Sequence, residues 1–87
     1  MITAIDKFAG INLTDEERKE VLDLVVFDKP ETVANPFSGE SVELCPEAVA
    51  IYDWIKGAEM LEDYKSVEIG LGIFMRNWPE AYMVLLD

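Results

Sequence analysis

Carboxylates are the one abundant class of side chain in this 87-residue chain that could carry catalysis or bind a metal ion. The sequence has 18 aspartates and glutamates, no histidine and a single cysteine, Cys45. Without histidine, neither a Ser–His nor a Cys–His nucleophile can be assembled. One cysteine also cannot supply the Cys/His cluster that a zinc site needs. Any chemistry predicted from this sequence therefore depends on acidic residues, and no metal or other cofactor is expected.

Two groups of acidic residues have helix-like spacing. Glu16, Glu17 and Glu20 form an E-E-x-x-E pattern, and Glu59 and Glu62 form a second pair. Facing helices that carry such carboxylates can hold Mg²⁺ through oxygen ligands. The pattern resembles that of the all-α nucleotide pyrophosphohydrolases, in which an E-x-x-D motif follows; here Glu62 takes the place of that aspartate. The resemblance implies a Mg²⁺-dependent hydrolase as an alternative function, although acids in the first turn of a capped helix need no metal.

The same acidic side chains could instead form a surface that imitates DNA. A protein that occupies a basic DNA-binding cleft needs carboxylates in rows at phosphate-like spacing. Two predicted helices carry candidate acids for such a surface: Asp15, Glu16, Glu20 and Asp23 on the first, and Glu59, Glu62 and Asp63 on or near the second. The simplest interpretation is a solvated surface that keeps a small apolar protein soluble. A DNA-mimicking inhibitor of a nucleic-acid-binding protein is a second alternative function.

Charge and composition exclude several classes of partner. The formal net charge of −11 opposes direct binding to nucleic-acid phosphates and to anionic membranes. Apolar residues make up 51% of the chain, enough to build the core of a single acidic domain over residues 1–87. No stretch approaches the ~18 apolar residues of a membrane span, and the first residues lack the features of a signal peptide. These observations predict a cytoplasmic protein.

Apolar periodicity indicates helices along most of the chain. Thr14 and Glu17 form a capping box, which marks the start of one helix. Pro46 and Pro79 stand where the first helical residue is often proline. Gly70 and Gly72 weaken the helix that contains them, or permit close approach of another helix. The predicted helices span residues 3–9, 15–27, 46–61, 63–77 and 79–86, and the run of β-branched residues near Phe27 leaves the end of the second uncertain.

The segment between the second and third predicted helices has a different composition. Residues 28–45 contain Pro30, an Asn35-Pro36 pair and a Ser38-Gly39 pair, which are typical of turns. We therefore expect an irregular connector of about 18 residues. Together with the helices, it predicts an all-α fold, a small bundle of four or five short helices with this connector lying across it.

Four apolar residues are candidates for an interaction surface. Trp54 lies off the main apolar face of its predicted helix, and Met60 and Leu61 follow at the end of that helix. Phe37 stands alone among polar residues in the connector. Aromatic residues are enriched among interface anchors, although most aromatics at helical spacing belong to the core. The predicted function is a non-catalytic protein-interaction domain that self-associates, as a homo-oligomer, or binds another protein, with acids at the rim that attract basic partners.

Three segments resemble parts of small uncharacterised proteins that tailed bacteriophages encode. They begin at Asn35 (N-P-F-S-G), at Tyr52 (Y-D-W-I-K-G-A-E) and at Trp78 (W-P-E-A-Y-M-V-L-L-D), and they cover about a quarter of the chain. None of them is a catalytic signature. The resemblance implies an accessory protein that works in the host cytoplasm by binding host machinery, and it assigns no residue a role.

Overall fold

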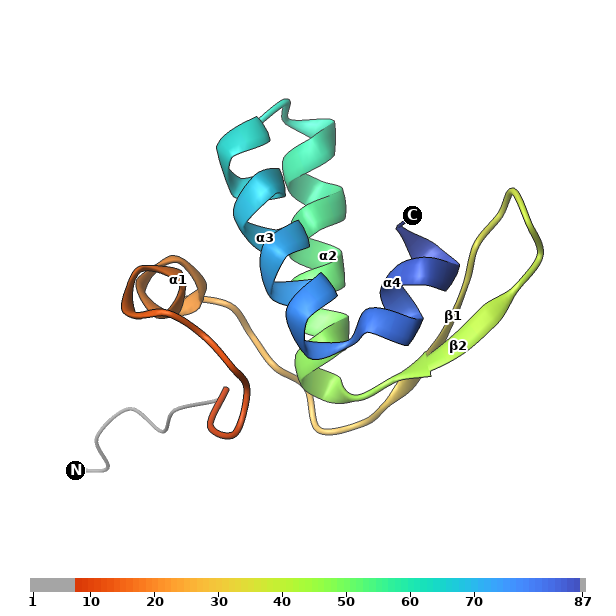
Figure 1. The fold of residues 1–87 in the computed structure, drawn as a ribbon, viewed down its shortest axis with the longest axis horizontal. Helices are drawn as coiled ribbons and strands as arrows, with labels where there is room; N and C mark the ends of the chain where they lie inside the picture. Colours follow the sequence, from red (N-terminus) through yellow and green to blue (C-terminus); the bar gives the residue numbers. More distant parts are fainter. Residues whose placement is uncertain (1–7, 87) are drawn as a thin grey trace.

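The structure is a computed structural model, and it describes residues 8–86. Its elements in chain order are α1 (Asp15–Val21), β1 (Glu31–Ala34), β2 (Ser41–Leu44), α2 (Pro46–Met60), α3 (Tyr64–Asn77) and α4 (Pro79–Leu85). The long helices α2 and α3 stand side by side as an antiparallel pair, with α1 on one flank and the strands and α4 on the other (Figure 1). None of the described helices is long and apolar enough to cross a membrane.

The all-α prediction is wrong, because part of the expected connector (28–45) is a two-stranded antiparallel sheet. Val33 lies opposite Val42 in this sheet. These two valines and the buried Leu44 pack against the core, while the residues between them are exposed. The period-two alternation is present in the sequence. It is short, however, because each strand has only four residues, and proline and glycine surround it.

The turn between β1 and β2 is held by the side chain of Asn35. Its Oδ1 accepts a hydrogen bond from the backbone N–H of Phe37 (2.8 Å), and its backbone N–H donates to the carbonyl of Glu40 (2.7 Å). Gly39 takes a positive φ of 79°, which glycine adopts without steric cost. The Asn35 Nδ2 group donates to the carbonyl of Val84 (2.8 Å) and so ties the turn to α4. This hairpin is therefore an ordered part of the fold.

The three helices predicted in the C-terminal half are confirmed within one residue at each end. Gly70 lets α2 and α3 approach closely, because a Cβ atom there would lie 2.5 Å from Cγ1 of Ile55. A Cβ atom added at Gly72 would meet no other atom within 4 Å. Only the first of the two glycines therefore has the packing role that the sequence suggested. Phe74 fills the core beside them, with its ring 5.3 Å from that of Trp78.

Helix α1 begins where the sequence predicts and ends six residues earlier. The capping box is confirmed. The Thr14 hydroxyl accepts a hydrogen bond from the backbone N–H of Glu17 (3.1 Å), and the Glu17 carboxylate accepts one from the backbone N–H of Thr14 (2.9 Å). The helix stops at Val21, so the predicted range 15–27 is too long. The segment Leu24–Phe27 leaves the helix because valine and phenylalanine favour extended backbone over a helix that little else stabilises.

The first predicted helix, 3–9, falls mostly outside the described residues. Its last part is described as a turn at Phe8–Gly10, in which Gly10 takes a φ of 88°. The Phe8 side chain is buried and belongs to the core. Gly10 therefore ends this turn, and the rest of the predicted helix, residues 3–7, lies outside the described residues.

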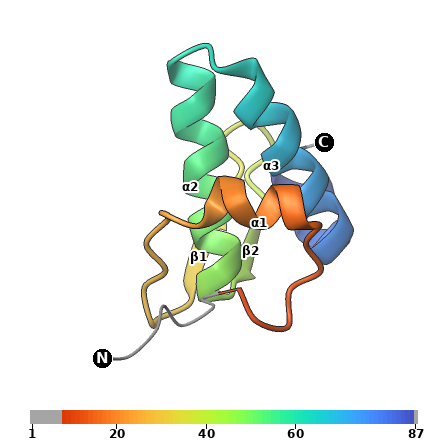
Figure 2. The same ribbon diagram turned by 90° about the vertical axis from the view of Figure 1, so that its left-hand side faces the viewer.

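Polar side chains at the end of α3 fasten the N-terminal region to the helices. The Oδ1 atom of Asn77 accepts a hydrogen bond from the backbone N–H of Asn12 (2.8 Å), and its Nδ2 group donates one to the Asn12 carbonyl (3.0 Å). Arg76 donates two hydrogen bonds to the carboxylate of Glu17, at 2.8 and 3.0 Å. Figure 2 shows α1 lying across the front of the α2–α3 pair. The buried Val21 adds an apolar contact, so α1 is fixed at both of its ends.

Candidate functional site

Among α2, α3 and α4, the turn that joins α2 to α3 carries the large apolar side chains that are most exposed to solvent. We call residues 59–64 the hairpin tip. Met60 is 85% exposed, Leu61 82% and Tyr64 66%. A single exposed apolar side chain is ordinary, but several that are adjacent form an apolar patch, which is informative. The hairpin tip is therefore an apolar surface that the fold itself leaves uncovered.

Backbone hydrogen bonds make the hairpin tip a defined turn. The N–H of Asp63 donates to the carbonyl of Ala58 (2.9 Å), and the N–H of Glu62 donates to that of Glu59 (3.1 Å). These two bonds form a Schellman motif, which usually has glycine at the left-handed position. Here that position is Glu62, with a φ of 57°. The chain therefore holds a carboxylate at the tip at a conformational cost of about 1 kcal/mol.

Asp63 caps the helix that follows the tip. Its carboxylate accepts the backbone N–H of Ser66 (3.3 Å) and the Ser66 hydroxyl (2.7 Å). These bonds favour the ionised form, so they lower the pKa of the Asp63 carboxyl below its ordinary value of 3.8. The carboxylate is consequently charged at neutral pH and fixed in place beside the apolar tip.

Charged groups surround the apolar part of the tip. Glu59, Glu62 and Asp63 are all exposed. Lys56 pairs with Glu59 at 3.4 Å, and its ammonium lies 5.5 Å from the centre of the Tyr52 ring. Lys65 also lies beside Asp63, so the apolar centre of the tip is surrounded by three carboxylates and two lysines. The rim keeps a small excess of negative charge, which favours a basic partner.

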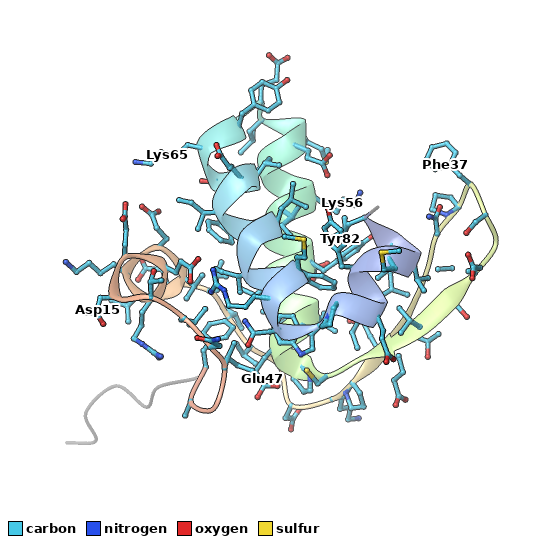
Figure 3. The ribbon with its side chains drawn as sticks, viewed as in Figure 1. Asp15, Phe37, Glu47, Lys56, Lys65 and Tyr82 are labelled. Atoms are coloured by element: carbon cyan, nitrogen blue, oxygen red, sulfur yellow. The ribbon has the colours of Figure 1, made fainter. Side chains whose placement is uncertain are left out.

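The predicted anchor residues fall in three different places. Met60 and Leu61 lie together at the hairpin tip. Trp54 is half-buried between α2 and α3, where its ring would lie 3.5 Å from a Cβ at position 70. Phe37 is 97% exposed at the turn of the β-hairpin, far from the position of Lys65 beside the helical tip (Figure 3). Of the four predicted residues, the structure therefore brings only Met60 and Leu61 together.

Tyr64 also belongs to this surface, although its sequence spacing is typical of a core residue. Its spacing relative to Val67 and Leu71 fits the apolar face of α3. The residue lies in the first turn of the helix, however, directly after Asp63. No part of α2 extends far enough to cover it there. The position of a helix start, and not the periodicity, was the signal that could have identified it.

The structure does not bring the two acidic groups together. The carboxylate of Glu17 lies against Arg76, near the C-terminal end of α3, whereas Glu59 and Glu62 lie beyond its N-terminal end. Tyr64 and Arg76, near the two ends of α3, are twelve residues apart, which corresponds to about 18 Å along the helix axis. Within residues 8–86, no three acidic or cysteine side chains are placed to hold one metal ion.

Glu17, the central acid of the E-E-x-x-E pattern, is already engaged. The Arg76 guanidinium, with help from Thr14, lowers the pKa of the Glu17 carboxyl below its ordinary value of 4.5 despite its partial burial. The neighbouring acids are exposed, namely Asp15, Glu16 and Glu20 on α1 and Asp23 in the turn after it, and Arg18 and Lys19 lie on the same short helix. This mixture of charges differs from the continuous acidic row that a DNA mimic needs.

A shallow groove lies between the β-hairpin turn and the helices. It has a volume of about 350 Å³, and its walls include Phe37, Tyr52, Leu71 and Leu85. The same groove contains Lys56, which is already paired with Glu59. The polar part of its lining comes from Asn35, Lys56 and Glu59, which are already engaged in a hydrogen bond or an ion pair within the chain, so the groove does not define a small ligand.

Comparisons of the chain with protein-family models, with curated proteins and with solved structures find no match. The surfaces described above are therefore the observations from which a function can be inferred.

Proposed function

We propose that the chain is a non-catalytic protein-interaction domain whose hairpin tip inserts Met60 and Leu61 into an apolar pocket, rimmed by lysine and arginine, on another protein. One observation carries this proposal: the two largest aliphatic side chains of the tip are more than four-fifths exposed on a hydrogen-bonded turn. Burying both would remove a substantial apolar area from water. Each contributes about 1.5–3 kcal/mol when fully buried.

The rigidity of the turn favours this function. A surface that is ordered before binding loses little conformational entropy when the partner arrives. The Schellman hydrogen bonds and the Asp63 cap fix the backbone of residues 58–66. The tip therefore retains more of the free energy of burial as affinity than a mobile loop of the same composition would.

The charge of the chain favours a basic partner. The formal net charge is −11, and three carboxylates, those of Glu59, Glu62 and Asp63, surround the apolar centre of the tip. Opposite charges at the rim of an interface raise the association rate, and salt screens this effect. We expect binding to weaken as the salt concentration rises. The proposed setting is the cytoplasm, which is the host cytoplasm if the chain is an accessory protein of a bacteriophage.

Crosslinking from the tip tests the proposal. A photoreactive phenylalanine replaces Leu61 in one variant and Met83 of α4 in a second, and bacterial lysate is irradiated with each. We expect a specific crosslinked protein only from position 61. The captured protein, once identified and purified, is then titrated by calorimetry with the natural chain, with Met60→Ser and with Met83→Ser.

The two methionine variants form a matched pair, because Met83 is 64% exposed on a different part of the surface. We expect Met60→Ser to weaken binding by about thirtyfold, the effect of a typical anchor residue, and Met83→Ser to change it less than threefold. Equal affinities for both variants would contradict the role of the tip. Hydrolysis of a nucleotide that depends on Mg²⁺ and on Glu16 or Glu59 would contradict the non-catalytic function.

A further inference from the structure

The N-terminal part of the described chain is an outer layer that a short connection joins to the rest. We call residues 8–26 the arm, residues 27–30 the hinge and residues 31–86 the body. The arm contains α1, of which Val21 is the buried residue, and Phe8 of the arm is buried in the same core. In Figure 2, α1 crosses the outside of the α2–α3 pair. The arm therefore packs on the body from outside and is not enclosed by it.

The body holds the arm through a specific docking site at the end of α3. The Arg76 guanidinium donates two hydrogen bonds to the Glu17 carboxylate, at 2.8 and 3.0 Å. The side chain of Asn77 exchanges two more with the backbone of Asn12, at 2.8 and 3.0 Å. Half-buried apolar residues of the arm add contacts with the core, namely Ile11, Leu13, Leu24 and Val26. An identical arm from a second copy of the chain would offer this site the same groups.

The hinge is exposed, and its sequence favours an extended backbone. Phe27 is 71% exposed, and the three residues after it are exposed as well. Within residues 8–86, no hydrogen bond holds the bend at Asp28 and Lys29. Pro30 has a fixed φ and no backbone N–H, and a residue that precedes proline favours extended backbone. Figure 1 shows the chain descending from α1 to the foot of α2 and turning there toward β1. Docking of the arm on its own body therefore depends on a short bent connection.

We propose that two copies of the chain exchange their arms, so that the arm of each copy docks on the body of the other. Exchange of an identical element keeps the contacts of the docking site and changes the conformation of the hinge alone. A short hinge promotes such exchange, because a straightened hinge carries the arm away from its own body. The inference concerns self-association and does not depend on the partner proposed for the hairpin tip.

The salt dependence of this dimer differs in sign from that of the tip. Two chains that each carry a net charge of −11 repel each other over the whole molecule. Raising the ionic strength from about 0.01 to 0.1 M shortens the screening length from about 30 to about 10 Å and suppresses this repulsion. We therefore expect self-association to strengthen with salt, whereas binding of a basic partner through the tip weakens.

Refolding of the whole chain at increasing concentration tests the exchange. The chain is unfolded in urea, refolded at high and low ionic strength and analysed by sedimentation. We expect a species of twice 9.8 kDa that grows with concentration and persists after dilution, because its return to monomers requires both arms to leave their docking sites. A chain that stays at 9.8 kDa in every condition overturns the exchange and leaves the function of the tip untouched.

An insertion in the hinge distinguishes exchange from other modes of association. Gly-Ser-Gly inserted between Asp28 and Lys29 lets the arm fold back on its own body, so it should raise the dissociation constant of the dimer about tenfold or more. The same insertion between Phe37 and Ser38, in the exposed turn of the β-hairpin, is the matched control and should leave the dimer unchanged. Circular dichroism checks that both variants keep the fold. Equal association of the two variants contradicts the role of the hinge.

Two charge variants test whether the docking site joins different chains. Glu17→Lys and Arg76→Glu each place like charges at the site, so neither variant should dock its arm alone. Exchange in a mixture brings opposite charges together at both sites, and we expect a dimer with one chain of each variant. A single chain with both substitutions is the control, and the amide signal of Asn12 reports whether its arm docks.

The outcomes separate arm exchange from association through the tip. A mixture that stays monomeric, while the doubly substituted chain docks its arm, overturns the exchange. A dimer that resists the hinge insertion and both charge variants but dissociates in Leu61→Glu shows that the tip is the self-association surface, which also overturns this proposal.

Discussion

The molecule contains two hairpins, one of helices and one of strands, and both carry exposed apolar residues at their turns. The α2–α3 hairpin presents Met60 and Leu61, and the β1–β2 hairpin presents Phe37. The first contains several fully buried side chains, whereas the second contributes one, Leu44, and is joined to α4 by the hydrogen bond from Asn35 to Val84. The comparison shows that two turns with similar exposed residues can belong to hairpins that are buried in the core to different extents. The effect of a mutation on stability therefore depends on the hairpin that contains it.

The largest difference between the hairpins is expected at two phenylalanines. Phe74 is fully buried in the helical hairpin between the rings of Tyr52 and Trp78. Phe74→Ala should lower the free energy of unfolding by about 3–5 kcal/mol, because it leaves a cavity in a small core. Phe37→Ala should change it by less than about 0.5 kcal/mol. Urea unfolding followed by circular dichroism measures both values, and similar losses for the two variants would refute the distinction.

A second pair of variants tests the close contact inside the helical hairpin. Gly70→Ala places a methyl group 2.5 Å from Cγ1 of the buried Ile55, and overpacking of this kind costs about 1–3 kcal/mol. Gly72→Ala meets open space and should stabilise the helix by about 1 kcal/mol. Thermal unfolding measures whether each substitution raises or lowers the stability of the protein. Stabilisation by both substitutions would show that α2 and α3 lie farther apart than described.

Each of the two hairpin turns contains one residue in the left-handed backbone conformation, and the residue type differs between them. Gly39 and Glu62 both have a positive φ, at 79° and 57°. Gly39→Ala should destabilise the fold by about 1 kcal/mol from conformational strain alone, because its Cβ would meet no atom. Glu62→Gly should stabilise it by about 0.5–1 kcal/mol. Chemical unfolding checks the opposite signs, and a loss of stability in Glu62→Gly would mean that the carboxylate itself stabilises the turn.

The smallest expected effect distinguishes the turns by pH. Asp63 caps the helical turn, and its pKa is lowered by the bonds from Ser66, whereas the β-turn is held by the uncharged Asn35. The stabilisation from Asp63 is therefore complete above pH 3.8 and is lost as the pH falls through the lowered pKa of the folded state. NMR titration of the Ser66 amide should report this midpoint, and Asp63→Asn should abolish the transition. An unshifted midpoint would contradict the hydrogen-bonded cap.

The helical hairpin could be predicted from the sequence because its pattern is long. Fifteen and fourteen residues of periodic apolar spacing, with Pro46 at the start of α2 and Pro79 just after the end of α3, define the two helices almost to the residue. The β-hairpin could not be predicted in the same way. Val33, Val42 and Leu44 give only three core-facing positions across two strands, and the sheet is stabilised by contacts of β2 with α2 and with α4, which is distant in the sequence.

The candidate site was only half predictable for a similar reason. Met60 and Leu61 follow the last turn of a predicted helix, where nothing in the sequence offers them cover. Trp54 looked equally exposed on a helical wheel, but the absent side chain of Gly70 makes room for α2 and α3 to enclose part of its ring. Separation of the acidic groups likewise depends on which end of α3 receives α1, a choice made by the hydrogen bonds of Arg76 and Asn77.

The positions of the two tryptophans determine which part of the molecule intrinsic fluorescence can monitor. Trp54 and Trp78, and all three tyrosines, lie on or between α2, α3 and α4, so intrinsic fluorescence reports on the helical half alone. A tryptophan in place of Phe37 would give the β-hairpin an emission signal of its own. Coincident melting curves from the two halves would then show that 79 residues of mixed architecture, from position 8 to position 86, unfold as one cooperative unit.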